Sequence, residues 1–551
     1  MHPTLILLNG TIHTMDDRNP RAEAVALRDG RIVAVGKADE VREAAGTGAE
    51  SIDLEGRTVI PGLIDAHVHL LSYALSLDRV NLEGVDSLAQ AVALVRERIV
   101  SAEPGAWIMG RGWDHNLWSG RLPRKEDLDR VAPRNPVALT RKDGHLVWCN
   151  SLALKAAGIG PGTPDPPGGQ IQRDADGEPT GILVETARDL VYAAIPTPSA
   201  QQRQEALRRA FPIAHSLGLT GVHEMGYLEG REALSDYQEL LARGELGLRV
   251  CAMIPRKRLD EAIALGLRSQ TLAGGSREPI TRAVVLRAFA STGFGNEWLR
   301  IGGVKIFMDG TLGSQTADML EAFEGQPGNR GVVVTSAEEI RELIRRASAA
   351  GLACAVHAIG DAAVRKVLDA VATGPGQPSV RHRIEHAQLV HPDDIPRFAQ
   401  LGVIASMQPI HAISDMEIAD RYWGARCRTA YAWRSLLDAG AHLAFGSDGP
   451  VETLSPLAGI HAAVTRQRAD GTPQDGWYPE QRLTVAEAVR AYTLGAAYAS
   501  GEESSRGSIA VGKLADLVVL SRDIFAIPPE EILETEVVAT VLDGKVVYWR
   551  P

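Results

Sequence analysis

The most informative part of the chain is Asp65-Ala66-His67-Val68-His69, which ends an apolar run that begins at Thr58. The run has the composition of a buried strand, and residues i and i+2 of a strand point to the same side. His67 and His69 can therefore enter one cavity while Val68 turns away. Two imidazoles at a strand end supply half of the ligands that a zinc-like ion takes in proteins. A chance pair on a solvated strand is the alternative, so further ligands must be sought along the chain.

Other polar residues stand within or at the ends of later apolar runs. Lys305 lies in one run, His357 and His386 end two others, and Asp448 ends the last. Taken alone, each has an ordinary explanation as a core histidine, a paired lysine or a turn residue. With the first pair they make four imidazoles, one carboxylate and one amine, too many for one tetrahedral ion. The set suits two divalent ions that share a bridge.

Lys305 is the unusual member of this set. An ammonium group in the apolar stretch Val304-Lys305-Ile306 is costly unless it is paired. Burial favours the neutral amine, which can react with CO₂ to form a carbamate, an anionic oxygen ligand. The alternative is a salt bridge from Lys305 to nearby Asp309.

These residues require a fold that brings the ends of distant strands together. The apolar runs alternate with helical patterns about eight times, which predicts an α/β fold, the closed (β/α)₈ TIM barrel. In such a barrel the carboxyl ends of the strands converge on one face. A doubly wound open sheet is the alternative, but no G-x-G-x-x-G follows any of the runs. The expected strands are 59–69, 220–224, 248–254, 301–307, 352–357, 382–386, 403–407 and 443–448.

The two ends of the chain read as short strands, with hairpin turns at Asp29-Gly30 and Asp543-Gly544. Neither end has enough apolar surface to fold alone, so we expect them to pair into a small composite β-sandwich. A long stretch after the first barrel strand exceeds a normal connection and predicts an inserted subdomain that covers the active face. The expected domains are the sandwich at 1–58 plus 505–551, the barrel at 59–75 plus 200–504, and the insertion at 76–199.

Composition limits the partners and the location. The net charge of −11 argues against nucleic acid or an anionic membrane as a partner. No run of eighteen apolar residues occurs, and the first residues lack the features of a signal peptide. The cysteines lie far apart without a C-x-x-C, which suits a reduced cytosol. We therefore expect a cytoplasmic enzyme with a small-molecule substrate, acting as a homo-oligomer, most simply a dimer. The four cysteines are Cys149, Cys251, Cys354 and Cys427.

Several motifs together resemble the amidohydrolase superfamily. Pro61-Gly62-Leu63-Ile64-Asp65-Ala66-His67-Val68-His69 carries the resemblance, with Asn9-Gly10 and Gly56-Arg57 before it. Internal stretches are similar to the YtcJ-like (amidohydrolase-3) branch, and the similarity covers nearly the whole chain. These stretches are 110–114, 141–145, 304–314, 357–361, 383–388 and 446–450.

The resemblance assigns roles to the candidate ligands. It implies that His67, His69 and Asp448 bind a first ion, and that His357 and His386 bind a second. Lys305 would be the carboxylated bridge between the two ions. Zinc is the expected metal, with manganese or cobalt as alternatives. Some members of the branch hydrolyse N-substituted amides.

The predicted activity is hydrolysis of an amide or N-substituted amide. A hydroxide bound by the two ions would attack the carbonyl, and Asp448 would take its proton and pass it to the leaving nitrogen. His145 and His223 are candidates for binding the developing oxyanion. A mononuclear deaminase of a nitrogen heterocycle is an alternative that needs no carbamate at Lys305. A metal-free binding protein on the same barrel is a second alternative.

Selectivity for an apolar substituent is expected from the insertion, which contains four of the nine tryptophans. Trp113 is the candidate for an exposed aromatic wall, because it follows the flexible Gly110-Arg111-Gly112 and precedes a polar run. The alternative is that these side chains form the insertion's own core. The four are Trp107, Trp113, Trp118 and Trp148.

Overall fold

The computed structural model describes residues 4–118, 122–142, 145–226, 233–265, 295–374 and 380–550. Asp143 and Gly144, from the motif at 141–145, lie outside the described residues. Contacts within the chain separate it into two compact units. The first contains Met1–Tyr73 and Gln204–Pro551, and the second contains Ala74–Arg203.

The first unit is built around a sheet of eight parallel strands, which follow one another across the sheet in chain order. The predicted TIM-barrel fold is therefore confirmed. The strands are β8 (Leu63–Val68), β15 (Leu219–Glu224), β16 (Arg249–Pro255), β17 (Leu299–Phe307), β18 (Cys354–Ala358), β19 (Arg383–His386), β20 (Ile404–Met407) and β21 (Leu443–Phe445).

The first and last barrel strands are joined just beyond the end of β21. The N–H of Asp448 donates to the carbonyl oxygen of His67 (2.7 Å), and the N–H of Ser447 donates to Oδ1 of Asp65 (3.0 Å). Gly446 permits this approach, because a Cβ atom there would lie 2.3 Å from the backbone nitrogen of His67. Closure of the barrel therefore places Asp448 beside His67, although the two are far apart in sequence.

Helices alternate with the strands and pack against the barrel through one apolar face. The side chain of Ser336 caps α11 (Ala337–Ala349) by accepting a hydrogen bond from the N–H of Glu339. In α11 the buried apolar residues recur at helical spacing, and they are Ile340, Leu343, Ile344 and Ala347. The other main helices of this unit are α7 (Ala200–Ser216), α8 (Leu234–Ala242), α12 (Asp361–Ala372), α13 (Ile395–Leu401), α14 (Pro409–Trp423) and α16 (Pro456–Thr465).

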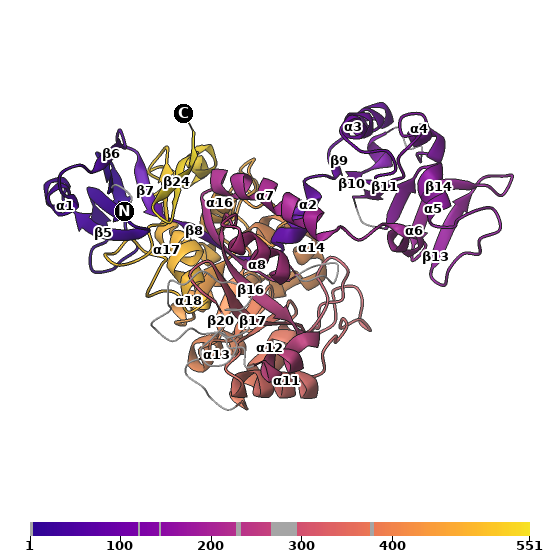
Figure 1. Ribbon diagram of the computed structural model, residues 1–551. Coiled ribbons are helices and arrows are strands. Elements are labelled where there is room, and N and C mark those ends of the chain that lie inside the picture. Colours follow the sequence, from indigo (N-terminus) through magenta and orange to yellow (C-terminus); the bar gives the residue numbers. More distant parts are fainter. Residues whose placement is uncertain are drawn as a thin grey trace. The chain divides into compact units, whose positions relative to one another are not determined.

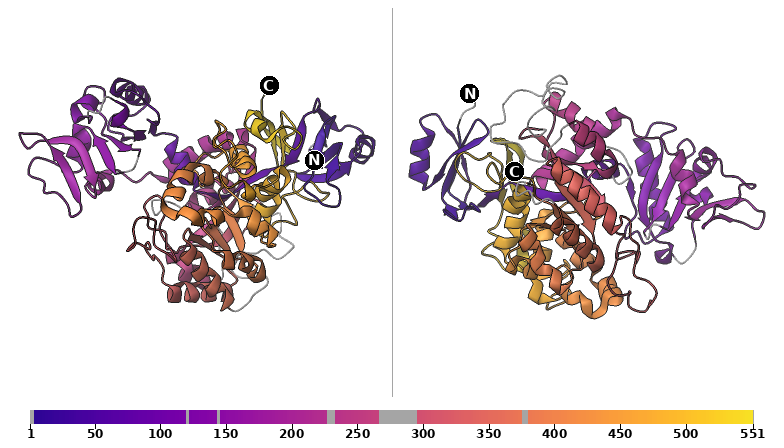
Figure 2. Two further views of the ribbon diagram at one scale, coloured as in Figure 1. Left: turned by 180° about the vertical axis from the view of Figure 1, so that it is seen from behind. Right: turned by 90° about the horizontal axis from the view of Figure 1, so that it is seen from below.

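Both ends of the chain contribute to one β-sandwich, as the sequence predicted. β22 (Leu517–Leu520) pairs antiparallel with β7 (Thr58–Pro61), and Val518 lies opposite Ile60. The indigo strands of the amino end and the yellow strands of the carboxyl end lie side by side in every view (Figures 1 and 2). The remaining strands are β1 (Leu5–Leu8), β2 (Thr11–His13), β3 (Arg21–Ala22), β4 (Ala24–Arg28), β5 (Arg31–Gly36), β6 (Glu50–Asp53), β23 (Val537–Leu542) and β24 (Lys545–Trp549).

The two predicted hairpin turns are present in this sandwich. Asp29 and Gly30 have φ values of 48° and 75°, and Asp543 and Gly544 have 55° and 74°. Positive φ at both central residues matches the right-handed twist of the flanking strands, which explains the Asp-Gly sequence. The turns connect β4 to β5 and β23 to β24.

The second unit has a six-stranded mixed sheet of its own, covered by short helices. Its apolar core includes Trp113, Trp118 and Trp148. The strands are β9 (Val80–Asn81), β10 (Ile108–Trp113), β11 (Val137–Arg141), β12 (Leu146–Cys149), β13 (Gly169–Arg173) and β14 (Pro179–Glu185), and the helices are α3 (Leu88–Val100), α4 (Lys125–Asp129), α5 (Ser151–Ala156) and α6 (Arg188–Ala194).

All four cysteines are buried and free. Among the described residues, no helix has both the length and the apolar character needed to cross a bilayer.

Candidate metal centre

The structure brings the predicted ligands together at the carboxyl ends of the barrel strands. His67 and His69 lie at the end of β8, Lys305 near the end of β17, and His357 in β18. The ring of His386, which ends β19, is 4.7 Å from the rings of both His67 and His357 between centroids. These side chains and that of Asp448 are buried. The site is therefore a compact group of imidazoles with one carboxylate and one amine.

The first set of ligand atoms fits a tetrahedral ion. Oδ1 of Asp448 lies 3.4 Å from Nε2 of His67 and 3.4 Å from Nε2 of His69. Bonds of 2.0–2.1 Å to a tetrahedral ion would place the ligand atoms about 3.3–3.4 Å apart. The two distances from Asp448 therefore match edges of such a site, and the ligand atoms of all three side chains lie within 4.8 Å of one another.

Hydrogen bonds to the far sides of the rings orient the imidazoles. Nδ1 of His67 donates to Oε2 of Glu385 (2.6 Å), and Nδ1 of His69 donates to the carbonyl oxygen of Gly226 (2.6 Å). A carboxylate and a carbonyl oxygen can only accept, so the proton of each ring lies on Nδ1. The lone pair of Nε2 then faces the centre in both residues, which is the arrangement that metal-binding histidines have.

His357 from β18 and His386 from β19 provide further nitrogen atoms that could bind a second metal ion. Nε2 of His357 donates to the carbonyl oxygen of Gly310 (3.0 Å), which leaves Nδ1 as the acceptor atom of that ring. Nδ1 of His386 is buried and has no hydrogen-bond partner among the described residues. A buried polar atom without a partner is rare and needs an explanation. A metal ion bound by His386 would provide one.

Burial keeps the imidazoles neutral, as metal ligands must be. It lowers the pKa of His67, with a further contribution from the charge of Lys305. Burial and the same charge lower the pKa of His357 to about 4. The pKa of His386 falls well below its ordinary value through burial and through the neighbouring His357 and His67. All three rings are therefore available as neutral donors at physiological pH.

Burial also favours the neutral form of Lys305. Loss of solvation lowers the pKa of this amine to about 8, against the opposing charges of Glu385 and Asp448. Nζ lies 3.5 Å from Nε2 of His67, within the ligand group. Asp309, the alternative partner, instead accepts hydrogen bonds from the backbone N–H groups of Asp318 and Gly360. The position of Lys305 thus suits the predicted bridging role.

Two candidate ligands have an unusual backbone conformation. The φ angle is 72° at His386 and 62° at Asp448, in the left-handed region that residues other than glycine rarely adopt. Such conformations cost free energy and gather at functional sites, where the surrounding structure enforces them. They accompany the entry of both side chains into the centre, His386 from the last residue of β19 and Asp448 from the segment that follows β21.

His411 belongs to the site but was not identified from the sequence. It lies in the first turn of α14, directly after β20, and its Nε2 is 3.2 Å from Oδ2 of Asp448. Ligand atoms of His386, His411 and Asp448 all lie within 4.8 Å of one another. The one local signal is position, because His411 follows the seventh predicted strand, 403–407, by four residues. It was missed because His411 stands in the following helix rather than in the strand.

His223 lies behind the ligand group. Its side chain is completely buried, and Nδ1 accepts a hydrogen bond from Nη1 of Arg383 (2.8 Å). Nε of Arg383 contacts Oε1 of Glu385 (2.5 Å), the carboxylate that orients His67. His223 therefore connects to the centre through Arg383 and Glu385. Its predicted contact with the oxyanion stays a prediction.

The prediction that Trp113 forms an exposed wall is wrong. Its side chain is buried, and its indole N–H donates to the carbonyl oxygen of Leu139 (2.7 Å). Its ring packs against those of Trp118 and Trp148 at centroid distances of 5.9 and 6.3 Å. The glycines before Trp113 belong to strand β10, so the ring enters the core of the second unit. There it meets the other tryptophans, as the alternative interpretation held.

His145 also lies in the second unit. Its side chain is exposed, and Nδ1 is 2.8 Å from Oε1 of Glu185. The substrate-binding role expected for His145 stays a prediction.

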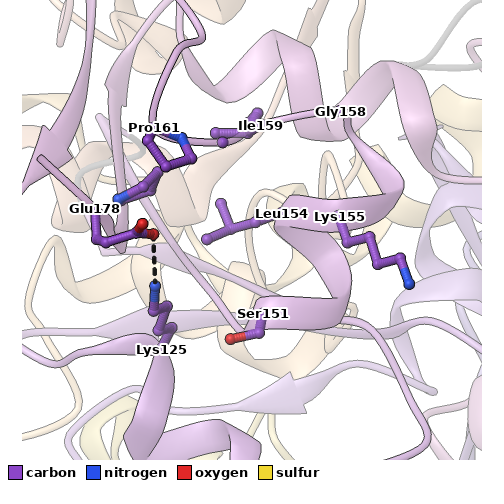
Figure 3. A pocket seen from close by; sticks show the side chains of 10 residues that line it. Lys125, Ser151, Leu154, Lys155, Gly158, Ile159, Pro161 and Glu178 are labelled. Carbon is purple, nitrogen blue, oxygen red and sulfur yellow. Dashed lines mark ion pairs between the residues drawn. The ribbon is translucent and has the colours of Figure 1, made fainter.

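A hollow of about 380 Å³ elsewhere in the second unit offers no comparable chemistry. Figure 3 shows Lys125 and Glu178 facing each other there, at 3.9 Å, beside the apolar side chains of Leu154 and Ile159. Lys125 and Glu178 form a surface ion pair, which contributes little to stability, and Lys155 also lines the hollow. We assign no site to this hollow.

Comparison with known proteins supports this interpretation of the barrel face. A model of the amidohydrolase family (Amidohydro_3) matches residues 50–548. The chain is 37% identical to the protein LONG AFTER FAR-RED 3 of Arabidopsis thaliana, over 99% of this chain and 91% of that protein. It is 36% identical to the putative amidohydrolase YtcJ of Bacillus subtilis, over 98% of each.

A relative with a named activity and a solved structure are also similar to the chain. The N-substituted formamide deformylase of Arthrobacter pascens is 33% identical, over 99% of this chain and 98% of that protein. The crystal structure of an uncharacterized metal-dependent hydrolase from Pyrococcus horikoshii superimposes with a TM-score of 0.77 at 28% identity, over 96% of this chain and 99% of that one.

Proposed function

This chain belongs to the amidohydrolase family, and on that premise we propose that it hydrolyses a small N-substituted amide at a centre of two divalent ions. The chain is a metal-dependent hydrolase that acts on carbon–nitrogen bonds. The observation that carries the proposal is the position of Asp448, whose Oδ1 lies 3.4 Å from Nε2 of both His67 and His69. This arrangement joins a metal site to a carboxylate that can move a proton.

The residues divide into two groups of ligands. His67, His69 and Asp448 would hold the first ion, and His357 and His386 the second, with Lys305 between them as a carbamate. Nitrogen and oxygen ligands of this kind suit zinc, with manganese or cobalt as alternatives. When bound, the ions would polarise the substrate carbonyl and lower the pKa of a water molecule toward neutrality.

Asp448 is the proposed proton carrier. Burial acts to raise the pKa of this carboxyl, but the hydrogen bond with His411 and the neighbouring imidazoles of His67 and His69 outweigh burial and hold the pKa well below its usual range. Asp448 is therefore a carboxylate at neutral pH and can accept the proton of the attacking water. It would then deliver that proton to the nitrogen as the C–N bond breaks, releasing a carboxylic acid and an amine.

The other residues keep this arrangement in place. Glu385 fixes the proton of His67 on Nδ1, and Arg383 holds Glu385. His411 contacts the second oxygen of Asp448 and restricts rotation of the carboxylate. The relative named N-substituted formamide deformylase supports an amide with a substituted nitrogen as the substrate class.

A combined metal analysis and substrate screen tests the proposal. Protein purified without chelators should contain two ions per chain. It should release amine from N-substituted formamides or other N-acyl amines when zinc, manganese or cobalt is supplied. Cyclic amides and esters complete the panel. Release of ammonia from a nitrogen heterocycle by protein with one ion would favour the deaminase alternative, and protein that binds no metal would overturn the proposal.

A further inference from the structure

Phe307 is an exposed aromatic side chain in a buried strand. The eight preceding residues of β17 are buried, whereas 44% of the surface of Phe307 is exposed. Complete burial of a phenylalanine side chain is favourable by roughly 1.5–3 kcal/mol, so a large exposed ring at the end of a core strand is unlike its surroundings. Packing among the described residues of the barrel does not explain this exposure.

The ring of Phe307 touches the proposed metal centre directly. Its centroid is 5.2 Å from that of His357 and 5.2 Å from Nζ of Lys305. Residues 305 and 307 are two apart in the strand, so their side chains point to the same side. Phe307 thus begins a row of rings that continues through His357 and His386 to His67, with successive centroid distances of 5.2, 4.7 and 4.7 Å.

More apolar surface lies next to this ring. Val332, Val333 and Val334 are 50%, 47% and 53% exposed. They are held beside the end of β17, because the N–H of Val334 donates to the carbonyl oxygen of Met308 (2.8 Å) and Oγ1 of Thr335 donates to that of Phe307 (2.6 Å). We call Phe307, together with this exposed valine segment whose backbone pairs with the end of β17, the apolar wall.

We propose that Phe307 is a substrate-contacting residue, and that this wall receives an aryl or branched alkyl group attached to the scissile amide. The inference rests on the proposed function and narrows its substrate class. A group bound to the amide must lie within a few bonds of the reacting carbon, and the ring of Phe307 lies 5.2 Å from the ring of His357 and from Nζ of Lys305, two of the proposed ligands. Such a group would cover the exposed ring and remove both apolar surfaces from water.

Binding of small probes to the metal-loaded protein tests the wall without requiring turnover. Phenylacetate and acetate represent the acyl side of the substrate, and benzylamine and methylamine represent the amine side. Calorimetric titration should show at least one phenyl probe binding about 10- to 100-fold more tightly than its methyl counterpart. The pair that shows the difference identifies which side of the amide the wall receives.

Variants of Phe307 should change this preference selectively. Phe307→Ala should reduce the phenyl-to-methyl ratio of affinities by about tenfold or more, while acetate and methylamine bind as before. Phe307→Leu should keep part of the preference. Trp549→Ala is the matched control, because Trp549 is also 44% exposed but lies in β24 of the sandwich. It should leave all four affinities unchanged.

Two results would contradict the proposal that the apolar wall binds a substrate group. One is a wild-type protein that binds phenyl and methyl probes equally. The other is a Phe307→Ala variant that weakens both kinds of probe alike. If the phenyl preference depends on Phe307 but no amide is hydrolysed, the proposal for the apolar wall is supported and the proposed amide hydrolysis is contradicted. With active enzyme, the same variant should raise KM for bulky amides and leave small amides nearly unaffected.

Discussion

Nε2 of His411 lies 3.2 Å from Oδ2 of Asp448, while the other oxygen of this carboxylate lies 3.4 Å from Nε2 of both His67 and His69. The carboxylate is therefore held from two sides. One oxygen faces the first group of proposed ligands, and the other faces a histidine from a different strand end. A carboxylate that must bind an ion and also transfer a proton needs this kind of fixed orientation.

His411→Asn should therefore lower kcat more than it changes KM. Loss of a residue that orients a ligand typically costs about 10- to 100-fold in activity or metal affinity. Steady-state kinetics and elemental analysis of the same preparation measure both effects. His391→Asn is a suitable control, because His391 stands beside Asp393 at an exposed position. A variant with wild-type kcat would show that Asp448 does not depend on His411. Loss of a bound ion from the His411→Asn variant would indicate that His411 is itself a metal ligand.

Asp448→Asn should keep the fold and lose turnover. Asparagine retains the shape and one ligand oxygen but cannot take a proton at neutral pH. Removal of a general acid–base group typically costs about 10²- to 10⁴-fold in rate. The rate should be compared at equal metal content, measured on the purified variant. Near wild-type turnover by metal-loaded Asp448→Asn would rule out the proton-transfer role.

Lys305→Ala should reduce metal content and remove most activity. The variant lacks the amine from which a bridging carbamate would form, and the cavity left behind is lined by imidazoles. A small carboxylic acid such as propionate can enter such a cavity and supply the missing oxygen ligands, so it should restore part of the activity. Elemental analysis with and without propionate measures the first effect. If Lys305→Ala keeps two ions and full activity, the bridging role is wrong.

Trp113→Ala should destabilise the second unit. A buried tryptophan replaced by alanine typically costs about 3–5 kcal/mol in the free energy of unfolding, because a cavity remains. The indole hydrogen bond to Leu139 is lost as well. Urea unfolding measures the change. Leu117→Ala in the same unit is the control, since that side chain is 52% exposed. Unchanged stability together with a raised KM would instead support the substrate-binding role that the sequence predicted for Trp113.

Glu502 makes the stability of the barrel depend on pH. Nη1 of Arg300 lies 3.1 Å from Oε1 of this buried glutamate, and Arg506 contacts Oε2. Burial acts to raise the pKa of Glu502, but the charges of Arg506 and Arg300 outweigh it and lower the pKa to about 2, from 4.5 in its unperturbed state. Because the folded state binds the proton less tightly than the unfolded state, the carboxylate stabilises the fold above pH 4.5. That contribution is lost as the pH falls from about 4.5 toward 2.

Glu502→Gln should therefore lower the melting temperature most at neutral pH. Removal of one partner of a buried ion pair typically costs about 3–5 kcal/mol. The difference from wild type should shrink as the pH falls below 4.5. Glu536→Gln is the control, because its ion pair with Arg550 is exposed and contributes little. A difference between wild type and Glu502→Gln that is constant with pH would contradict the assigned role.

The barrel could be predicted because each of its strands carries a local signal. An apolar run that ends in a polar residue, such as Val356-His357, predicts a buried strand. The polar residue also indicates that the end of this strand lies at the functional face of the barrel. The two hairpin turns could likewise be predicted, because the two residues Asp-Gly are sufficient to favour this turn conformation. These features depend on neighbours in sequence, so one chain was sufficient to recognise them.

What was missed depends on contacts between distant segments. His411 lies in the first turn of a helix, and its position shortly after a predicted strand does not by itself distinguish it from a surface histidine. Closure of the barrel brings it to Asp448. Trp113 was misplaced because its glycines and polar neighbours suggested exposure. Its burial comes from pairing of β10 with β11 and from Trp118 and Trp148. Phe307 stands in a strand that the sequence identified, yet its exposure appears only in the folded chain.

The pairing of β7 with β22 affects the order in which this protein can assemble. Pro61 at the end of β7 leaves the ribosome about 450 residues before Leu517 at the start of β22. At synthesis rates of about 5–20 residues per second, β7 has no partner on this edge for roughly 20–90 s. An unpaired strand edge beside an apolar surface is prone to aggregate during that interval. The nascent chain is therefore a candidate client for chaperones until β22 has been made.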